Sequence, residues 1–264
     1  MPELAELKLT ADYINESASG LKYKNIEKNP EHKGERINKP FDTFEITSES
    51  RGKELVLNFV CPDSKKEKKL FMTMGMSGHF SQTYTGDEKK HAHLKFHATN
   101  GTTLSFVDVR RFGKWKFKED WSKDRGPDPT VEPDKFKYNI LKNLDKKAFE
   151  QPIHLILMNQ KYFNGIGNYL RAEILYRLPD VDPFSQARDV IEKYPMILEL
   201  CRDIPRQAYL RGGGQLKDWE NPFKTESEQF EKFMKCYGNP KMSKVRDKNG
   251  RMFWYDPKWS KKGE

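Results

Sequence analysis

The residues that most directly suggest chemistry stand at the start of the chain, where Pro2 follows the initiator methionine. Removal of Met1 turns Pro2 into a free secondary amine, which can attack an electrophilic carbon and form a Schiff base as a catalytic lysine does. The pKa of such an amine is close enough to neutrality that burial can keep it uncharged and nucleophilic. Many chains begin with Met-Pro for no chemical reason, so the neighbouring residues must decide between these interpretations.

Two acidic residues accompany Pro2 at the start of a predicted helix. Over residues 3–16 an apolar residue recurs at helical spacing, at Leu4, Leu7, Ala11 and Ile14. Glu3 and Glu6 lie one turn apart on a neighbouring face, so a helix that begins directly after the N-terminus places the amine of Pro2 beside both carboxylates. Acidic residues also stabilise a helix N-terminus through its dipole, which remains the alternative interpretation.

A region of short strands follows this helix. Between about residue 20 and residue 118, short apolar runs with a period of two are separated by turn-forming clusters. This pattern is typical of an antiparallel sandwich or barrel. Lys53 opens one of the strands, and the lysine-rich stretch 64–69 is expected to be an exposed hairpin loop.

Two glycine-flanked segments at strand ends carry side chains of another kind. Residues 75–78 read Gly-Met-Ser-Gly, and residues 108–113 read Asp-Val-Arg-Arg-Phe-Gly. Glycines at strand ends favour loops, so Met76, Arg110 and Phe112 are expected on loops. The alternative is that Met76 and Phe112 belong to the core.

The second half of the chain is expected to be helical. Residues 119–134 are rich in Pro, Asp and Gly, which predicts a linker between two domains. The pattern of residues 159–173 then predicts a helix, a tight glycine turn and a second helix. Gly165 and Gly167 let the backbone approach a phosphate closely, and the amide of Asn168 can then bind it. A motif built only for packing is the alternative.

The C-terminal segment carries most of the net charge of +9. Residues 232–264 hold ten Lys and Arg, three acidic residues and several aromatic residues. This combination indicates a nucleic-acid surface, although a solvated basic tail has a similar composition. Asn249-Gly250 is a strong hairpin signal, so a β-hairpin is expected near the end of the chain.

Cysteine and histidine usage argues against a metal centre. Cys61, Cys201 and Cys236 are scattered and form no Cys-x-x-Cys pair, so a four-ligand structural zinc site is not expected. His91 and His93 have a spacing that could chelate a metal on a strand, and a metal-dependent nuclease is the corresponding alternative function. The surrounding alternation favours a half-buried strand with both histidines on a basic outer face.

Length and hydropathy set the remaining bounds. A chain of 264 residues allows one large or two modest domains, and 36% hydrophobic with 33% charged residues is typical of a soluble globular protein. No apolar run approaches the ~18 residues of a membrane span, and no signal-peptide pattern is present. Neither a membrane protein nor a secreted protein is therefore expected.

Taken in order, these motifs resemble the formamidopyrimidine-DNA glycosylase and endonuclease VIII family, whose members are bifunctional base-excision repair enzymes. The resemblance covers nearly the whole chain, from the N-terminal Pro-Glu through Arg51-Gly52-Lys53, the two glycine-flanked segments and the helix–two-turn–helix to a C-terminal finger. It is closest to the animal endonuclease VIII-like branch whose finger lacks zinc. One departure is Ala5, where many relatives have proline, but this change removes no reactive group.

The resemblance implies an α+β fold in two domains. Residues 1–118 would form an N-terminal catalytic domain, an antiparallel β-sandwich with a leading α-helix. Residues 119–134 would form the linker. Residues 135–264 would form a helical DNA-binding domain that contains the helix–two-turn–helix and a zincless β-hairpin finger at about 236–260.

The resemblance also assigns catalytic roles. Neutral Pro2 would attack C1′ of a flipped nucleotide and Glu3 would protonate the opening sugar, after which β- and δ-elimination from the Schiff base would cut the strand. Lys53 would hold a phosphate or sugar oxygen of the lesion, and Glu6 would help to orient the pocket. An ordinary surface lysine and a helix-stabilising acid are the alternatives for these last two residues.

The same resemblance assigns DNA-binding roles. Met76, Arg110 and Phe112 match the triad that fills the hole left by the flipped nucleotide, for which a flexible, a hydrogen-bonding and a stacking side chain are suited. Asn168 and Arg251 would bind phosphates beside the lesion and contribute salt-dependent affinity.

Lesion choice is expected to depend on residues 204–214, which correspond to the loop that covers the flipped base, with Arg206 as the candidate for base contact. The branch prefers oxidised pyrimidines, formamidopyrimidines and hydantoins over 8-oxoguanine. The expected partner is double- or single-stranded DNA with oxidised bases or abasic sites, bound by a nuclear monomer that needs no cofactor or metal. The main alternative function is a DNA-binding relative that has lost catalysis.

Overall fold

The computed structural model describes residues 2–214, 221–223 and 228–260. The chain divides into two compact units, the first made of Met1–Ser122 with Gly213–Thr225 and the second of Lys123–Gly212 with Glu226–Glu264. The division after Ser122 falls within the segment 119–134 that the sequence suggested as a linker. Of the described residues within 213–225, Gly213, Gly214 and residues 221–223 group with the first unit, whereas the sequence predicted that they belong to the C-terminal domain.

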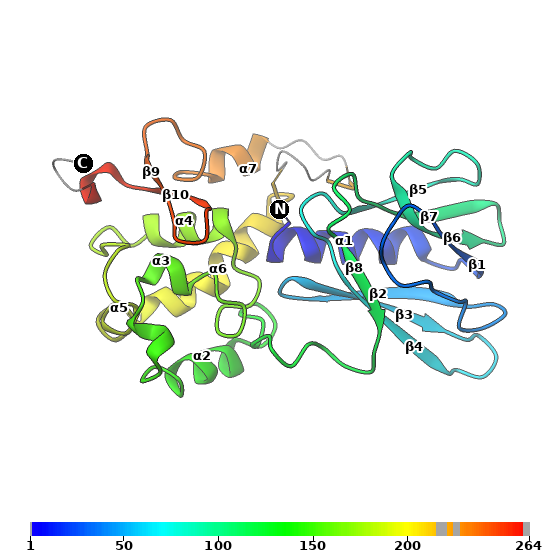
Figure 1. Cartoon of the computed structure of the whole chain (residues 1–264), viewed down its shortest axis with the longest axis horizontal. Coiled ribbons are helices and arrows are strands. Elements are labelled where there is room, and N and C mark those ends of the chain that lie inside the picture. The colour runs from blue at the N-terminus through cyan, green and yellow to red at the C-terminus, as the bar shows by residue number, and fades with distance from the viewer. Residues whose placement is uncertain (1, 215–220, 224–227, 261–264) are drawn as a thin grey trace. The chain divides into compact units, whose positions relative to one another are not determined.

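The first unit is an antiparallel β-sandwich with a leading helix, α1 (Leu4–Ala18) (Figure 1). One sheet has the strand order β1-β6-β7-β5 and the other the order β2-β3-β4-β8. The strands are β1 (Tyr23–Lys28), β2 (Glu45–Arg51), β3 (Glu54–Val60), β4 (Glu67–Thr73), β5 (His79–Tyr84), β6 (Ala92–Ala98), β7 (Thr102–Val107) and β8 (Lys114–Phe117).

Alternating side chains build the core between the two sheets. Leu94 and Phe96 on β6 are fully buried, as are Leu104 and Phe106 on β7, because they lie two residues apart on the inner face of each strand. β3 is buried along nearly its whole length, since it has β2 on one side and β4 on the other.

Helix α1 packs against the edge strands of both sheets, β2 and β5. Asn15 exchanges two hydrogen bonds with the backbone of Ser48 on β2, at 2.9 and 2.7 Å. The hydroxyl of Tyr13 accepts the N–H of Gln82 on β5 at 3.0 Å, and the Gln82 side chain donates to the Ser17 carbonyl at 2.8 Å. These bonds fix the axis of α1 and therefore the place where the helix begins.

The second unit is helical and ends in a hairpin (Figure 1). Its helices are α2 (Pro133–Leu141), α3 (Ile153–Ile156), α4 (Asn168–Tyr176), α5 (Ala187–Lys193), α6 (Met196–Leu210) and α7 (Glu228–Phe233), with short 3-10 turns at Lys147–Glu150 and Pro257–Trp259. Strands β9 (Ser243–Arg246) and β10 (Met252–Tyr255) pair antiparallel. Helix α4 packs against both α6 and β10, so it connects the hairpin to the helices.

Two local predictions are wrong. His93 does not lie on an exposed outer face but is buried. Ala92, Leu94 and Phe96 keep the predicted inner face, and the ring of His32 packs against His93 with the ring centres 4.8 Å apart. The stretch 64–69 is not entirely a loop, since β4 already begins at Glu67.

The predicted fold class is confirmed. The chain is α+β, with an antiparallel sandwich and a leading helix, then a helical region and a terminal hairpin. Within the described ranges, no helix has the length and apolar character needed to cross a membrane.

Candidate functional site

Pro2 and Glu3 lie directly before α1, and both are buried. Glu3 is the N-cap of the helix and forms a capping box with Glu6. The Glu6 carboxylate accepts the N–H of Glu3 at 2.8 Å, and the Glu3 side chain accepts the backbone N–H of Glu6. The spacing of these two acids therefore fixes both carboxylates at the helix end that Pro2 precedes.

A glycine loop closes on the same carboxylate. The second oxygen of Glu6 accepts the N–H of Gly214 at 3.0 Å. Gly213 has a φ of +64°, and a Cβ at this position would lie 2.6 Å from Cδ1 of Leu9 and 3.1 Å from Oε1 of Glu6. Glycine is needed here both for the left-handed backbone and for the close approach to α1. Glu6 thus joins the start of α1 to this loop.

Lys53 lies in the turn of the β2–β3 hairpin. Arg51 pairs with Glu54 across this turn, and Gly52 takes the positive φ of +58° that a two-residue hairpin turn requires. Lys53 is half-buried. Because β3 begins at Glu54, the residue stands one position before the strand that it was predicted to open.

The two glycine-flanked loops interlock. The Ser77 hydroxyl donates to Asp108 at 2.5 Å and accepts the N–H of Arg110 at 3.0 Å, while the other Asp108 oxygen accepts the N–H of Gly113 at 2.7 Å. Gly75 has a φ of +61°, and a Cβ there would lie 2.7 Å from backbone atoms of the other loop. The β4–β5 and β7–β8 loops are therefore joined around the fully buried carboxylate of Asp108.

The interlocked loops carry Met76, Arg110 and Phe112, as predicted. Phe112 is 53% exposed, and the exposed guanidinium of Arg110 lies 5.3 Å from the centre of its ring. Met76 is half-buried. Phe112 is therefore not a core residue, and an exposed phenylalanine beside an arginine is free to stack on an aromatic ligand.

A cavity of about 750 Å³ also opens beside this loop. Its lining includes Phe112, Lys114 and Trp115, but it does not include Pro2, Glu3 or Glu6. Cavity size alone therefore does not locate the candidate nucleophile.

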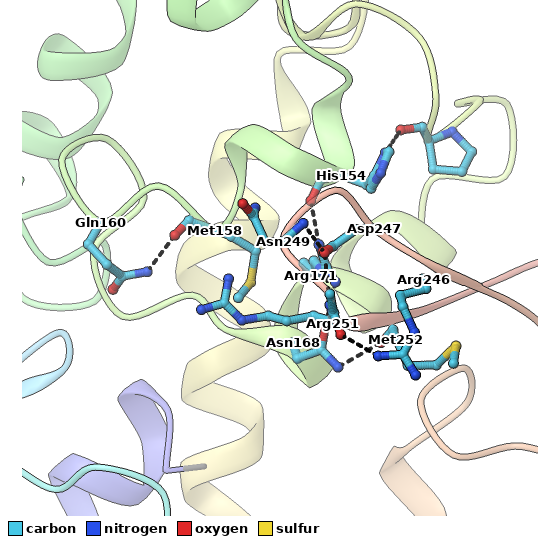
Figure 2. A network of polar contacts seen from close by, with 12 residues as sticks. His154, Met158, Gln160, Asn168, Arg171, Arg246, Asp247, Asn249, Arg251 and Met252 are labelled. Carbon is cyan, nitrogen blue, oxygen red and sulfur yellow. Dashed lines mark hydrogen bonds and ion pairs between the residues drawn. The ribbon is translucent and has the colours of Figure 1, made fainter. Parts of the chain in front are cut away.

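In the second unit, α4 begins after a turn that the Gln160 side chain closes (Figure 2). Gln160 donates to the carbonyls of Met158 and Ile166 at 3.0 and 2.9 Å and accepts the N–H of Gly165 at 3.0 Å. Gly165 has a φ of +93°. The first helix predicted within residues 159–173 is wrong, because residues 159–167 form turns and the helix before them, α3, is a single turn that ends at Ile156.

Asn168 and Arg171 on α4 hold the C-terminal hairpin (Figure 2). Asn168 donates to the Met252 carbonyl at 2.8 Å and accepts from Arg171 at 2.6 Å. The fully buried Arg171 forms an ion pair with Asp247 at 2.9 Å and donates to the His154 carbonyl at 3.0 Å. An amide nitrogen carries two hydrogens, so Asn168 can hold the hairpin and also donate to a ligand.

Asp247 closes the turn of that hairpin. One of its oxygens accepts the N–H groups of Asn249 and Arg251, both at 2.9 Å. Burial by itself would raise the pKa of the Asp247 carboxyl, but the hydrogen bond from Arg251 and the pairing with Arg171 outweigh burial and lower that pKa. The carboxylate therefore stays charged at neutral pH, with the exposed Arg251 at the end of the turn.

Glu173 anchors the segment that leads into the hairpin. Its carboxylate is fully buried and accepts the backbone N–H groups of residues 235–237 at 2.8 to 3.0 Å. Arg177, one helical turn later, supplies a counter-ion at 2.5 Å. Helix α4 thus holds the C-terminal finger through three polar side chains, Asn168, Arg171 and Glu173.

The predicted loop over residues 204–214 is wrong in its first half. Residues up to Leu210 belong to α6, with Pro205 inside the helix. The buried residues of α6 recur at helical spacing and include Ile197, Cys201, Ile204 and Ala208, so burial of this apolar face outweighs the loop signal of the proline and the later glycines. Arg206 is exposed on α6, and its contact with a base stays a prediction.

No group of three or more His, Cys, Asp or Glu side chains is placed to hold a metal ion in the described part of the chain. The finger cysteine, Cys236, is buried. Burial first, and then the negative charges of Glu173 and Asp256, raise the pKa of its thiol to about 12. The thiolate form that a metal requires is therefore disfavoured.

Sequence reasoning missed the residues that hold these elements in place. Ser77 and Asp108 were quoted only as parts of glycine-flanked motifs, and Arg171 and Glu173 only as parts of the helix–turn–helix. A usable signal was present in α4, where two charged residues stand within an otherwise apolar helix. Charged residues in such a position are rarely buried without partners, so they indicate a polar contact with another element.

Comparison with known proteins identifies the class. Residues 1–115 match the "Formamidopyrimidine-DNA glycosylase N-terminal domain" family, and residues 227–258 match the "Endonuclease VIII-like 1, DNA bind" family. The chain is 37% identical to Endonuclease 8-like 1 of Mus musculus and 36% identical to that of Homo sapiens, in each case over 97% of this chain and 72% of the relative. It is 30% identical to the formamidopyrimidine-DNA glycosylase of Rickettsia africae, over 90% of this chain and 88% of that protein.

Solved structures share the fold. The MutM (Fpg) protein of Thermus thermophilus superposes with a TM-score of 0.80 at 22% identity over the whole of both chains. The Lactococcus lactis Fpg in complex with abasic-site DNA gives 0.78 at 22% identity, over 98% of this chain and all of that one. At this level of identity the likeness shows the fold alone.

These matches define the class as DNA glycosylases of base excision repair with AP lyase activity. Within that class, the chain belongs to the formamidopyrimidine-DNA glycosylase and endonuclease VIII family. The predicted similarity to the animal endonuclease VIII-like branch is confirmed by both Endonuclease 8-like 1 relatives and by the match over residues 227–258.

Proposed function

We propose that this chain removes oxidised bases from DNA with Pro2 as the nucleophile and cuts the strand by β,δ-elimination. One observation carries the proposal: α1 begins directly behind Pro2, and a capping box holds the buried carboxylates of Glu3 and Glu6 at that helix end. The proposal requires removal of Met1, which lies outside the described residues.

The reaction follows from a secondary amine beside a carboxyl group. The lone pair of the Pro2 nitrogen forms a bond to C1′ while the bond between C1′ and the base breaks, and the base leaves with that electron pair and takes up a proton. The Pro2 nitrogen, now positively charged, loses its own proton to the Glu3 carboxylate. Glu3 protonates the ring oxygen as the sugar opens, which leaves an iminium between Pro2 and C1′. The iminium acidifies the C2′ hydrogen, so successive eliminations expel the 3′ and 5′ phosphates and hydrolysis releases the sugar.

Two further residues would support this chemistry. The half-buried Lys53 in the β2–β3 turn would bind a phosphate or sugar oxygen of the lesion through its ammonium group. Glu6 is held by the N–H groups of Glu3 and Gly214, so it has a fixed orientation from which to shape the pocket.

The remaining candidates would grip the DNA. Met76, Arg110 and Phe112, carried by the interlocked loops, would fill the hole that a flipped nucleotide leaves in the duplex. Asn168 at the start of α4 and the exposed Arg251 at the hairpin turn would bind phosphates of the damaged strand.

The proposed substrates are oxidised pyrimidines, formamidopyrimidines and hydantoins, in double- or single-stranded DNA, together with abasic sites. The similarity to two animal Endonuclease 8-like 1 proteins supports this choice and supports a nuclear location. We propose a monomer, with Arg206 as the candidate for base contact. A panel of lesions in which 8-oxoguanine proved to be the best substrate would overturn the assignment.

Borohydride trapping tests the proposed chemistry. The protein with Met1 removed is incubated with a duplex that contains one thymine glycol, and borohydride then reduces any iminium to a permanent covalent bond. We expect a trapped complex with the wild type and none with Pro2→Ala or with a tag retained ahead of Pro2. Nicking should persist in EDTA, since the proposed mechanism uses no metal.

A parallel reaction with an abasic-site duplex separates the possible failures. Trapping on the abasic site alone would mean that thymine glycol is the wrong lesion. No trapping on either duplex, despite tight binding, would mean a DNA-binding relative without lyase chemistry.

A further inference from the structure

Two histidines that the proposed reaction does not use are buried side by side in the sandwich. His32 is 4% exposed and His93 is 1% exposed. Their ring centres are 4.8 Å apart, and His32 also stacks on Trp115 at 4.3 Å. His93 reaches the backbone of Asp108, the residue that joins the two interlocked loops.

Hydrogen bonds to the backbone fix the tautomer of each neutral ring. The N–H of Gly34 donates to Nδ1 of His32 at 2.9 Å, so this Nδ1 carries a lone pair and Nε2 carries the proton. Nε2 of His93 lies 2.9 Å from the carbonyl oxygen of Asp108. A carbonyl only accepts, so Nε2 of His93 carries the proton and its Nδ1 carries the lone pair.

The two remaining ring nitrogens are complementary. Nε2 of His32 is a donor and Nδ1 of His93 is an acceptor, and both are buried with no hydrogen-bond partner among the described residues. A donor and an acceptor on rings 4.8 Å apart can bond to each other, directly after a small rotation or through one water. A metal ion does not fit between them, because the Gly34 N–H keeps the proton of His32 on Nε2.

We propose that His32 and His93 form a one-way hydrogen-bond relay, from the Gly34 N–H to the Asp108 carbonyl, that positions the loop 108–113. His93 is then a positioning residue for the void-filling side chains on that loop. This role rests on the proposed function, because it matters only if those side chains enter the duplex.

The relay is complete only while both rings are neutral, since a proton on Nδ1 of His93 would set a donor against a donor. The pKa of both His32 and His93 is lowered, and burial is the largest cause, so burial favours the neutral form of each ring. The charged groups that face them are Asp108, which favours protonation, and Arg111, Lys28 and His91, which oppose it. The relay is therefore present above about pH 6.5, the ordinary pKa of histidine, and is lost as the pH falls through the lowered pKa of His93.

Nitrogen NMR of the full chain tests the relay directly. Long-range ¹H–¹⁵N correlations at neutral pH should show the Nε2–H tautomer for both His32 and His93. An Nδ1–H tautomer at either ring would overturn the relay, whatever the activity of the protein.

Two variants at position 93 test the positioning role. His93→Gln keeps a donor for the Asp108 carbonyl but cannot titrate, whereas His93→Leu removes the donor. The readout is the ratio of kcat/KM for one lesion in a duplex to kcat/KM for the same lesion in a single strand, because only a duplex has a hole to fill. The wild-type ratio should be constant above about pH 6.5, the ordinary pKa of histidine, and should fall at lower pH as the pH passes through the lowered pKa of His93.

In His93→Gln the ratio should not change with pH. In His93→Leu the ratio at neutral pH should be roughly tenfold lower than in the wild type, which corresponds to ~1.4 kcal/mol of lost transition-state stabilisation on the duplex. His97→Gln, on the same strand, should behave like the wild type. An acid fall that persists in His93→Gln would overturn the proposal, as would equal losses on both substrates in His93→Leu. If the wild type cuts neither substrate, the proposed function fails, and the NMR measurement still decides the relay.

Discussion

Each unit of this chain has a loop that is closed by a buried aspartate, Asp108 in the first unit and Asp247 in the second. The two aspartates have different partners. In the sandwich, Asp108 accepts a hydroxyl and an N–H group from the interlocked loops. In the finger, Asp247 accepts two N–H groups of its own turn and also forms an ion pair with the buried Arg171. The first loop closure relies on neutral donors, whereas the second relies on charge.

The difference shows how a finger can be held by side chains of a neighbouring helix. On helix α4, the Arg171 guanidinium forms an ion pair with Asp247, and the Glu173 carboxylate accepts the backbone N–H groups of residues 235–237. Removing one partner of a buried ion pair leaves an uncompensated charge, whereas losing one neutral donor to a carboxylate that keeps another donor costs less. The finger should therefore be more sensitive than the sandwich loops to the loss of a single side chain.

The largest effect is expected from Arg171→Met. This change leaves Asp247 buried without its counter-ion, so the free energy of unfolding of the second unit should fall by ~3–5 kcal/mol. Chemical denaturation measures the loss. Lys241→Met, an exposed lysine before the hairpin, should change the same quantity by no more than about 0.5 kcal/mol. An equal loss of unfolding free energy in both variants would contradict the claim that the ion pair of Arg171 with Asp247 holds the finger.

Gly75→Ala should have the next largest effect, and it acts on the sandwich loops. The new Cβ would meet the backbone of the other loop at 2.7 Å, which should displace the side chains that we propose to fill the duplex. Overpacking of ~1–3 kcal/mol predicts a roughly tenfold to hundredfold loss of excision from a duplex. Gly20→Ala is the matched control, because its φ of +70° is similar and nothing lies within 4 Å. Similar losses in both variants would assign the effect to backbone strain.

His154→Phe should change how the stability of the second unit depends on pH. Burial lowers the pKa of His154 more than the hydrogen bond to the Pro183 carbonyl raises it. The stabilisation by the neutral ring is therefore complete above about pH 6.5 and is lost as the pH falls through the lowered pKa. Phenylalanine cannot titrate, so the free energy of unfolding should fall less between neutral and mildly acidic pH than in the wild type. An unchanged pH dependence would contradict this assignment.

The smallest effect is expected from Arg251→Ala, which should weaken DNA binding evenly across sequences. Loss of the phosphate contact that we propose for Arg251 should lower the slope of log affinity against log salt by ~1. Arg246→Ala on the same hairpin is the control, because the Arg246 side chain is bonded to the Gly250 carbonyl at 2.9 Å. A salt titration in which Arg246→Ala lowers the slope as much as Arg251→Ala would show that general charge, and not a placed contact, binds the DNA.

The sequence predicted where side chains of a given type lie better than it predicted what holds them. Lys53 lies in a hairpin turn, and Arg110 with Phe112 lies on a loop, close to the predicted places. Glycines and alternating strands are local signals, so they locate turns and loops without knowledge of the tertiary structure.

The partners of those elements depend on contacts between segments far apart in the sequence. The pairing of Arg171 with Asp247 and the contact of Glu6 with Gly214 appear only once the chain is folded. The failed predictions have the same origin. Residues 204–210 are helical because one face of α6 is buried. His93 is buried because the ring of His32, which comes much earlier in the chain, packs against it.

The measurement that tests the central claim most directly is peptide mapping of the borohydride-trapped complex by mass spectrometry. If Pro2 is the nucleophile, the reduced sugar adduct should be found on the N-terminal peptide, on the nitrogen of Pro2, in protein from which Met1 has been removed. An adduct on Lys53 or on any other lysine, with an unmodified N-terminal peptide, would contradict the account.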